Sequence, residues 1–231
     1  MFDTLSHMAT DETRERVIDA GERLFAAGGE DATSLRAITR EADVNVAAIH
    51  YHFGDRDGLI EAIVDRRLQP LNARRLELLD ALLAAQADPT VRDLLVAFAR
   101  PDLEVIDEMR HTGRAQLARM MGRAYTLPSP KVGAMMQRQF APIARAFLPR
   151  FAAAIPHLGE RELRARIDLV VSVITLQFAR AGDPGEPGPM GVEGVDGLDG
   201  QLDRLVGFLA PGLEAPAARV AGNDTTERTT A

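Results

Sequence analysis

A short segment near the amino terminus, residues 43–59 (DVNVAAIHYHFGDRDGL), combines small apolar residues with three polar rings. His50, Tyr51 and His52 can donate hydrogen bonds to phosphate oxygens. The valine and two alanines ahead of them would let a helix backbone approach base edges closely and touch thymine methyl groups. Because large polar rings are poor residues for an apolar core, this segment predicts a surface that meets a nucleic-acid duplex.

Two short helices and a three-residue turn must position these side chains. Thr33 and Ser34 offer N-cap chemistry for a first helix, whose apolar residues recur at helical spacing. Asp43 tolerates the left-handed geometry of a tight turn, and Asn45 can cap a second helix over about 46–52. This spacing is typical of a helix-turn-helix unit, in which the second helix enters the major groove.

The second helix should have one buried and one exposed side. At 100° per residue, Ile49 and Phe53 face the core, whereas Ala47 and Tyr51 point the opposite way. On the first helix, Arg36 could reach a guanine with its two-pronged guanidinium. Beyond the second helix, an arginine stands near the start of the next helix, where an anion is favoured.

The segment TSLRAITREADVNVAAIHYHFGDRDGLIEAIV resembles the N-terminal signature of the TetR family of transcriptional regulators, over about residues 12–68. The resemblance implies base contacts from Arg36, Val46 and Ala47. It implies phosphate contacts from Thr33, Ser34, Ala48, Tyr51, His52 and Arg56. His50 fills a place often taken by tyrosine, and the capping Asn45 completes the predicted DNA-binding set.

Two departures from the family pattern concern the turn and the first helix: Asp43 replaces a usual glycine, and Thr39 replaces a small alanine. Residues 1–68 carry eight arginines against 14 acidic residues, a balance of −6 within a chain of net charge −7. Few counterions should therefore be released per half-site, so we expect modest affinity for DNA. The alternative is a helical small-molecule-binding or interaction protein without effective DNA binding.

The remaining sequence also shows helical periodicity and no strand-like alternation, which predicts an all-α protein. The predicted helices cover residues 13–27, 34–42, 46–52, 55–86, 89–100, 103–111, 115–126, 130–155, 160–181 and 201–213. Pro101 is expected to end one of them, and Pro142 to kink another.

The predicted domains are a helix-turn-helix domain over 11–55 and a helical ligand-binding and dimerisation domain over 56–215, with a flexible tail over 1–10 and a disordered one over 216–231. Within the second domain, residues 182–200 carry glycine at every third position. Collagen has that period, but six triplets flanked by helices favour a flexible acidic loop over a triple helix.

Methionines and aromatic residues of the second domain could line an effector pocket, because methionine adapts to varied apolar shapes. The candidates are Phe98, Met109, Met121, Tyr125 and Phe140. Arg110 and Arg114 could hold a carboxylate, and a weaker resemblance to fatty-acid-responsive repressors implies an apolar or acyl-type effector. The plain alternative is that these residues pack the core.

The family resemblance implies a homodimer, formed by the helices over 160–181 and 201–213 and their copies. Their apolar residues are predicted at the interface: Ile167, Val170, Val171, Ile174, Phe178, Leu205 and Phe208. A two-fold dimer presents two recognition helices, so the operator should be a near-palindrome. An effector that favours a mismatched spacing of these helices would release the repressor from DNA.

Other function classes receive no support from the sequence. It contains no nucleotide-binding loop, no nucleophile elbow and no metal cluster, so we expect no catalytic residues, cofactor or metal. His50 and His52 are two apart and point to different sides of a helix. Cysteine is absent, which fits a reducing cytoplasm. No apolar run suits a membrane span, and the start does not resemble a signal peptide.

Overall fold

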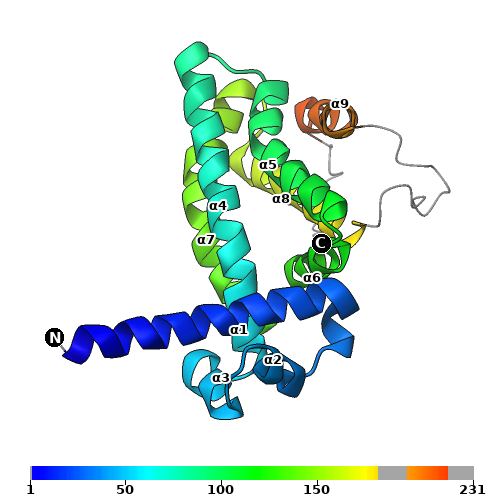
Figure 1. Cartoon of the computed structure of the whole chain (residues 1–231). Coiled ribbons are helices and arrows are strands. Elements are labelled where there is room, and N and C mark those ends of the chain that lie inside the picture. Colours follow the sequence, from blue (N-terminus) through cyan, green and yellow to red (C-terminus); the bar gives the residue numbers. More distant parts are fainter. Residues whose placement is uncertain (1, 182–196, 218–231) are drawn as a thin grey trace, which may run out of the picture.

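The structure is a computed structural model that describes residues 2–181 and 197–217, with side chains described within 11–29, 33–181 and 197–217 (Figure 1). All regular secondary structure in these ranges is helical, which confirms the all-α prediction. The helices are α1 (Phe2–Ala32), α2 (Leu35–Glu41), α3 (Val46–Phe53), α4 (Arg56–Ala85), α5 (Val91–His111), α6 (Ala115–Thr126), α7 (Pro130–Ala154), α8 (Glu160–Ala179) and α9 (Leu198–Glu214).

Helix α1 begins at Phe2, so residues 2–10, which the sequence predicts to be part of a flexible tail, are helical in the structure. The segment 2–10 contains neither glycine nor proline, so nothing in it stops a helix that continues from residue 11. At the other end, Gly29 interrupts the helical geometry with φ 77° and ψ 172°, close to where the glycine pair predicted an end.

Helix α5 corrects the prediction that Pro101 ends a helix, because it continues through this residue to His111. Proline removes one backbone donor and disturbs the preceding turn, but packing against neighbouring helices can outweigh that cost. Here the buried apolar stripe continues on both sides of Pro101, with Leu95 before it and Leu103 after it. Helix α7 likewise runs as one element through Pro142.

Two parts of the molecule are joined by one long helix (Figure 1). Helices α1, α2 and α3 form a unit at one end, and α4 runs from this unit to the far end of the second part. Helix α7 packs along α4, α5 packs on α4 and α9, and α6 packs on α8. Because α1 also packs on α6, the two parts contact each other directly as well as through α4.

Two local features fix the second part. A Cβ on Gly122 would lie 2.1 Å from the backbone nitrogen of Ala179, so only glycine allows α6 and α8 to approach this closely. Arg166 on α8 donates to the carbonyls of Gly212 and Leu213 at 3.1 and 3.0 Å, and so holds the end of α9.

The segments 182–196 and 218–231 lie outside the described residues, and so do most of the glycine triplets and most of the predicted disordered tail. No helix in the part that the structure describes has the length and apolar character needed to cross a membrane.

Candidate nucleic-acid interface

Helix α2 and the turn after it are held by local hydrogen bonds. The Ser34 hydroxyl accepts from the Ala37 backbone N–H at 3.1 Å and caps α2. Asp43 forms the turn in a left-handed conformation, with φ 51°. From α1, Arg16 donates to the carbonyl oxygens of Ala42 and Asp43 at 2.5 and 2.8 Å. The first helix therefore fixes the turn that aims α3.

Helix α3 has the two sides that the helical wheel predicts. Asn45 caps it by accepting from the Ala48 backbone N–H at 2.9 Å. Ile49 is fully buried and anchors the inner side together with Phe53. On the outer side Tyr51 has 78% of its surface exposed, which is unusual for a large aromatic residue. Ala47 and Val46 are exposed beside it, so small side chains precede the tyrosine on an open ridge.

The structure places the side chain of Thr33 inside the protein, and its phosphate contact stays a prediction. Thr33 is buried, and its hydroxyl donates to the carbonyls of Gly29 and Leu24 at 2.8 and 3.3 Å. Its side chain closes the end of α1 and does not face solvent. Arg56 is half-buried, donates to the Thr33 carbonyl at 2.6 Å and lies over the Phe25 ring. The structure thus gives this guanidinium partners inside the unit, besides the phosphate contact that the sequence predicts for it.

The two histidines of α3 differ in their surroundings. Exposed His50 donates through Nδ1 to the Gly54 carbonyl at 2.9 Å, because a carbonyl oxygen can only accept. The neutral ring then has Nε2 as an acceptor, and only the protonated ring could donate from Nε2 to a phosphate. His52 is half-buried, with its ring edge-on to Tyr51 at 5.0 Å between centroids.

The remaining predicted DNA contacts, Ser34, Arg36, Asn45, Val46, Ala47 and Ala48, all lie on α2, α3 or their caps. Sequence reasoning missed two cations that reach the turns after α2 and α3 from other helices. Arg16 comes from α1, and Lys131 comes from α7, where its amine lies 2.7 Å from the Asp55 carboxylate. The one available signal was that Lys131 is the single lysine of the chain.

Part of the negative charge of the N-terminal segment is neutralised within the protein. Arg66 of α4 pairs with Asp19 and Glu22 of α1 at 2.7 and 2.8 Å. Arg67 also pairs with Glu22, which is buried. Both arginines belong to residues 1–68 and are already counted in the balance of −6, so these ion pairs join α1 to α4 but leave that balance unchanged.

Asp43 places a negative charge on this surface that would repel the phosphates of DNA, since its side chain is fully exposed. Asparagine also tolerates the left-handed turn, so Asp43→Asn should remove the charge and keep the fold. We expect the variant to bind DNA about two- to fivefold more tightly at low salt, the size of an exposed ionic interaction. Fluorescence anisotropy measures this, with Asp80→Asn on the exposed far part of α4 as control. Equal affinity in both variants and wild type would contradict the prediction.

Two cavities lie at the borders of the three-helix unit. One, of about 320 Å³, opens between this unit and α7 and is lined by charged and apolar residues, among them Arg14, Phe53, Glu61 and Arg138. The other, of about 270 Å³, is lined by Gly28 and Gly29 near the end of α1 and by α6 residues including Arg119. Neither is lined by the residues predicted to bind an effector.

The core of the second part contains a buried ion pair that sequence reasoning missed. Arg75 of α4 is 1% exposed and pairs with Asp102 of α5, which is 2% exposed. Arg75 also donates to the Phe98 carbonyl at 2.9 Å and to the Asn72 side chain at 2.5 Å. Its guanidinium lies over the rings of Phe98 and Phe140, at 4.8 and 5.5 Å from their centroids. Burial raises the pKa of Asp102, and the charge of Arg75 opposes that shift.

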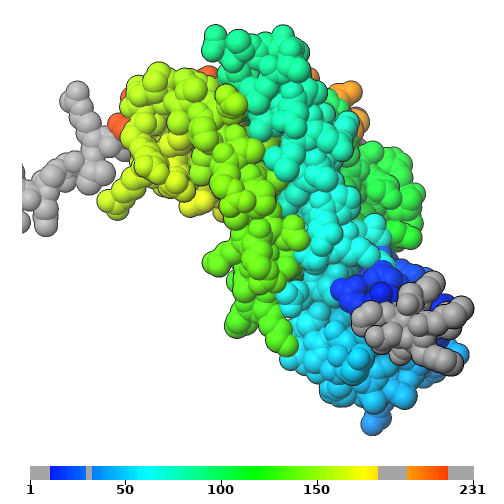
Figure 2. Space-filling model, turned by 90° about the vertical axis from the view of Figure 1, so that its left-hand side faces the viewer, coloured from blue at the N-terminus to red at the C-terminus, as the bar shows by residue number. Residues whose placement is uncertain are grey.

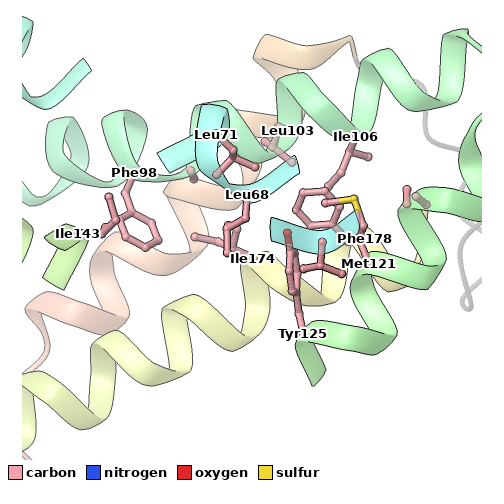
Figure 3. Packing of buried hydrophobic residues seen from close by; sticks show 14 of the residues in the cluster. Leu68, Leu71, Phe98, Leu103, Ile106, Met121, Tyr125, Ile143, Ile174 and Phe178 are labelled. Atoms are coloured by element: carbon pink, nitrogen blue, oxygen red, sulfur yellow. The ribbon is translucent and has the colours of Figure 1, made fainter. Parts of the chain in front are cut away.

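The predicted effector residues divide between this core and the surface. Met109, Met121 and Tyr125 are buried with Phe98, and Figure 3 shows Met121 and Tyr125 packed beside Phe178. The Tyr125 hydroxyl is buried without a hydrogen-bond partner among the described residues, and burial raises its pKa.

Neither arginine predicted to hold a carboxylate donates a hydrogen bond to that hydroxyl. Arg114 is exposed at the start of α6, and its contact with an effector stays a prediction. Arg110 is half-buried and reaches Gln201 of α9 at 3.5 Å, although its Nε is buried without a partner among the described residues.

The predicted dimer residues also divide into two groups. Val170, Ile174 and Phe178 are buried inside their own chain, and their place at a dimer interface stays a prediction. Ile167, Val171 and Leu205 are half-buried, and Phe208 has 75% of its surface exposed. On α8, Leu169 is 66% exposed, a position that the sequence prediction did not include.

Comparisons with known proteins agree with this architecture. A family model described as "Bacterial regulatory proteins, tetR family" matches residues 17–63, and one described as "Tetracyclin repressor-like, C-terminal domain" matches residues 96–212.

Individual relatives match over much of the chain. The HTH-type transcriptional repressor KstR of Rhodococcus jostii is 28% identical over 142 residues, 55% of this chain and 66% of that protein. The HTH-type transcriptional regulator BetI of Burkholderia lata is 25% identical over 172 residues, 74% of this chain and 84% of that protein. In fold, the chain resembles a TetR family transcription regulator from Marinobacter aquaeolei VT8, with a TM-score of 0.53 and 14% identity over 88% of this chain and 96% of the other.

Proposed function

This chain belongs to the TetR family of bacterial regulatory proteins, and from that premise we propose that it is a transcriptional repressor that a small molecule releases from its operator. The observation that carries the proposal is the outer side of α3, where Tyr51 and the small residues before it stand exposed on a buried anchor. A helix of this shape fits a major groove, because small side chains let its backbone approach the bases. Such a regulator works where the operator is, in the cytoplasm.

The proposed repressor binds DNA as a homodimer. Support comes from the second part of the molecule, where Leu169 of α8 and Phe208 of α9 expose large apolar side chains. A second copy would cover such residues, as obligate interfaces do. Two-fold symmetry then predicts a near-palindromic operator, with half-sites about 34–36 Å apart or a multiple of that distance.

A charge on α9 should break this dimer. Phe208→Glu would place a carboxylate within the apolar interface, and we expect dimer affinity to fall about 30-fold or more, as at an interface hot spot. Sedimentation velocity over a concentration series measures the change. Leu127→Glu is the control, because Leu127 is 85% exposed and is the C-cap of α6, so it belongs to neither α8 nor α9. Dissociation of both variants, or of neither, would contradict the proposed interface.

The proposed effector is an apolar molecule with one hydrogen-bonding group, bound between the helices of the second part. Its support is the unpartnered Tyr125 hydroxyl, which lies among apolar side chains of α6 and α8. An unpaired buried hydroxyl is costly, so a ligand that supplies its partner gains affinity there. Binding would have to separate side chains that are in contact in this structure, and the resulting shift of α4 would change the spacing of the two α3 helices.

The function is tested by selecting bound fragments from a random DNA pool and measuring their affinity at several salt concentrations. The proposal expects a near-palindromic consensus and affinity that falls as salt rises. Failure to enrich any sequence at low salt would refute it. That result would favour a helical small-molecule-binding protein without effective DNA binding, the function class that the acidic balance of residues 1–68 and Asp43 support.

A further inference from the structure

The single lysine of the chain connects two elements that are far apart in sequence. Lys131 lies in the first turn of α7, and its Nζ is 2.7 Å from Asp55 Oδ2, 76 residues away. Asp55 lies two residues after the end of α3 and caps α4, since its Oδ1 accepts from the Gly58 backbone N–H at 2.9 Å. One carboxylate therefore holds both the first turn of α4 and the start of α7.

Gly54, the residue between α3 and Asp55, connects Asp55 to the end of α3. Gly54 has φ 77°, which glycine adopts readily and other residues rarely do. Its carbonyl accepts from His50 Nδ1 at 2.9 Å, and its N–H donates to the His50 carbonyl at 3.1 Å. The end of α3, the tight turn and Asp55 are thus joined by successive short contacts.

The remainder of α7 is attached to α4 by three further polar contacts. Arg138 pairs with Glu61 at 3.2 Å, and Gln139 donates to Asp65 at 2.7 Å. The Gln139 carbonyl also accepts from Asn72 at 3.2 Å. In this series of contacts the residue numbers on α7 and on α4 rise together, so the two helices run side by side in the same direction. Figure 2 shows α7 lying along α4 down to the three-helix unit. Lys131 is the end of this series nearest to α3.

The part of α7 that follows Gln139 contacts the core around the buried Arg75–Asp102 ion pair. Phe140 lies against the Arg75 guanidinium, and Phe147 packs edge-on against Phe98 at 5.2 Å between centroids. A displacement of α7 in the core would therefore reach the turn behind α3 through Lys131 and Asp55, in addition to any displacement along α4.

We propose that Lys131 is a positioning residue for DNA recognition: through Asp55 it ties the start of α7 to the turn that sets the orientation of α3. This inference rests on the proposed DNA-binding function. The ion pair is exposed, with 45% of the lysine side chain and 56% of the aspartate side chain accessible. Its effect is one of orientation, since exposed pairs contribute little to overall stability. The contact lowers the pKa of Asp55 and raises that of Lys131, so both are charged at neutral pH.

Matched variants separate this role from capping and from a direct phosphate contact. Lys131→Gln removes the cation, and Asp55→Asn removes the charge but keeps an oxygen that can cap α4. We expect each to raise the operator Kd about three- to fivefold, because the competent orientation of α3 becomes less populated. The double variant should bind no more weakly than either single variant. Lys131→Arg should restore wild-type affinity.

The proposal would be overturned by an operator Kd unchanged by Lys131→Gln, or by independent effects that multiply in the double variant. A fall of about one in the slope of log operator affinity against log salt concentration for Lys131→Gln would also overturn it, since that indicates a phosphate contact.

Hydrogen exchange of peptides covering residues 50–60 provides a readout without DNA. Both single variants should accelerate exchange in these peptides and leave the thermal unfolding of the protein unchanged. If exchange responds as expected but the random pool yields no operator, the proposed function fails while the contact is upheld.

Discussion

Replacing Arg75 with methionine is expected to lower the free energy of unfolding by about 3–5 kcal/mol, because it leaves the carboxylate of Asp102 buried without its cation. Arg75 and Asp102 are each 2% exposed at the side chain, so water cannot take the place of the missing partner. Urea unfolding at a fixed protein concentration measures the loss. A loss below about 1 kcal/mol would show that the pair is solvated in solution.

The control for Arg75→Met is the double variant Arg75→Met/Asp102→Leu, in which no charge remains buried. Replacing a buried pair by apolar residues is often neutral, so the double variant should recover most of the lost stability. If the double variant is as unstable as the single one, the packing of the long arginine side chain matters more than its charge.

The loss of unfolding free energy in Arg75→Met should also depend on pH. Burial already raises the pKa of Asp102 above its ordinary 3.8, and losing the arginine removes the charge that opposes this shift. Between the unfolded and the raised folded pKa, the folded state binds more protons than the unfolded state, so stability falls as the pH rises. Arg75→Met should therefore regain stability as the pH is lowered from neutral towards about 4. A deficit that does not change over this window would contradict the burial of an unpaired carboxylate.

Replacing Ala47 with glutamate is expected to weaken operator binding about 100-fold or more, since it removes close base contact and adds a charge that phosphates repel. Ala47 is exposed on the same side of α3 as Tyr51, and a longer side chain there would hold the helix away from the bases. Anisotropy with the selected operator measures the change.

Ala84→Glu is the matched control for this substitution, because Ala84 is exposed on the far part of α4 and receives the same charge. Its operator affinity should equal that of wild type, and both variants should unfold at the wild-type temperature. If Ala47→Glu binds the operator like Ala84→Glu, then α3 is not the element that reads DNA.

Local signals in the sequence were sufficient for the helix-turn-helix unit. Ser34 and Asn45 cap their helices as predicted, and Ile49 is buried as the helical wheel requires. Capping and periodicity depend on residues three or four positions apart, which a sequence displays directly. The hydroxyl of Thr33, predicted to contact a phosphate, bonds to the end of α1 in the structure, because the same hydroxyl chemistry suits either role.

Contacts between distant segments could not be predicted in this way. Arg75 occupies a position on the apolar side of α4, seven residues after Leu68, but nothing local indicates that its partner is Asp102 of α5. Pro101 was predicted to end a helix because proline removes a backbone hydrogen bond and disturbs the preceding turn, which the sequence displays directly. The packing that offsets this cost involves other helices. The ion pair of Lys131 with Asp55 could not be predicted either, because the two residues lie on segments far apart in the sequence.

The scarcity of lysine has a practical result for anyone who attaches this protein to a surface or a dye. Reagents that acylate amines will find one side chain to modify besides an α-amino group, and that side chain is Lys131. A sensor chip coupled through amines would neutralise and tether the molecule at the carboxylate beside its recognition helix, so the affinities recorded there would describe an altered protein. Coupling through an engineered cysteine leaves that amine intact, because the chain has no cysteine of its own.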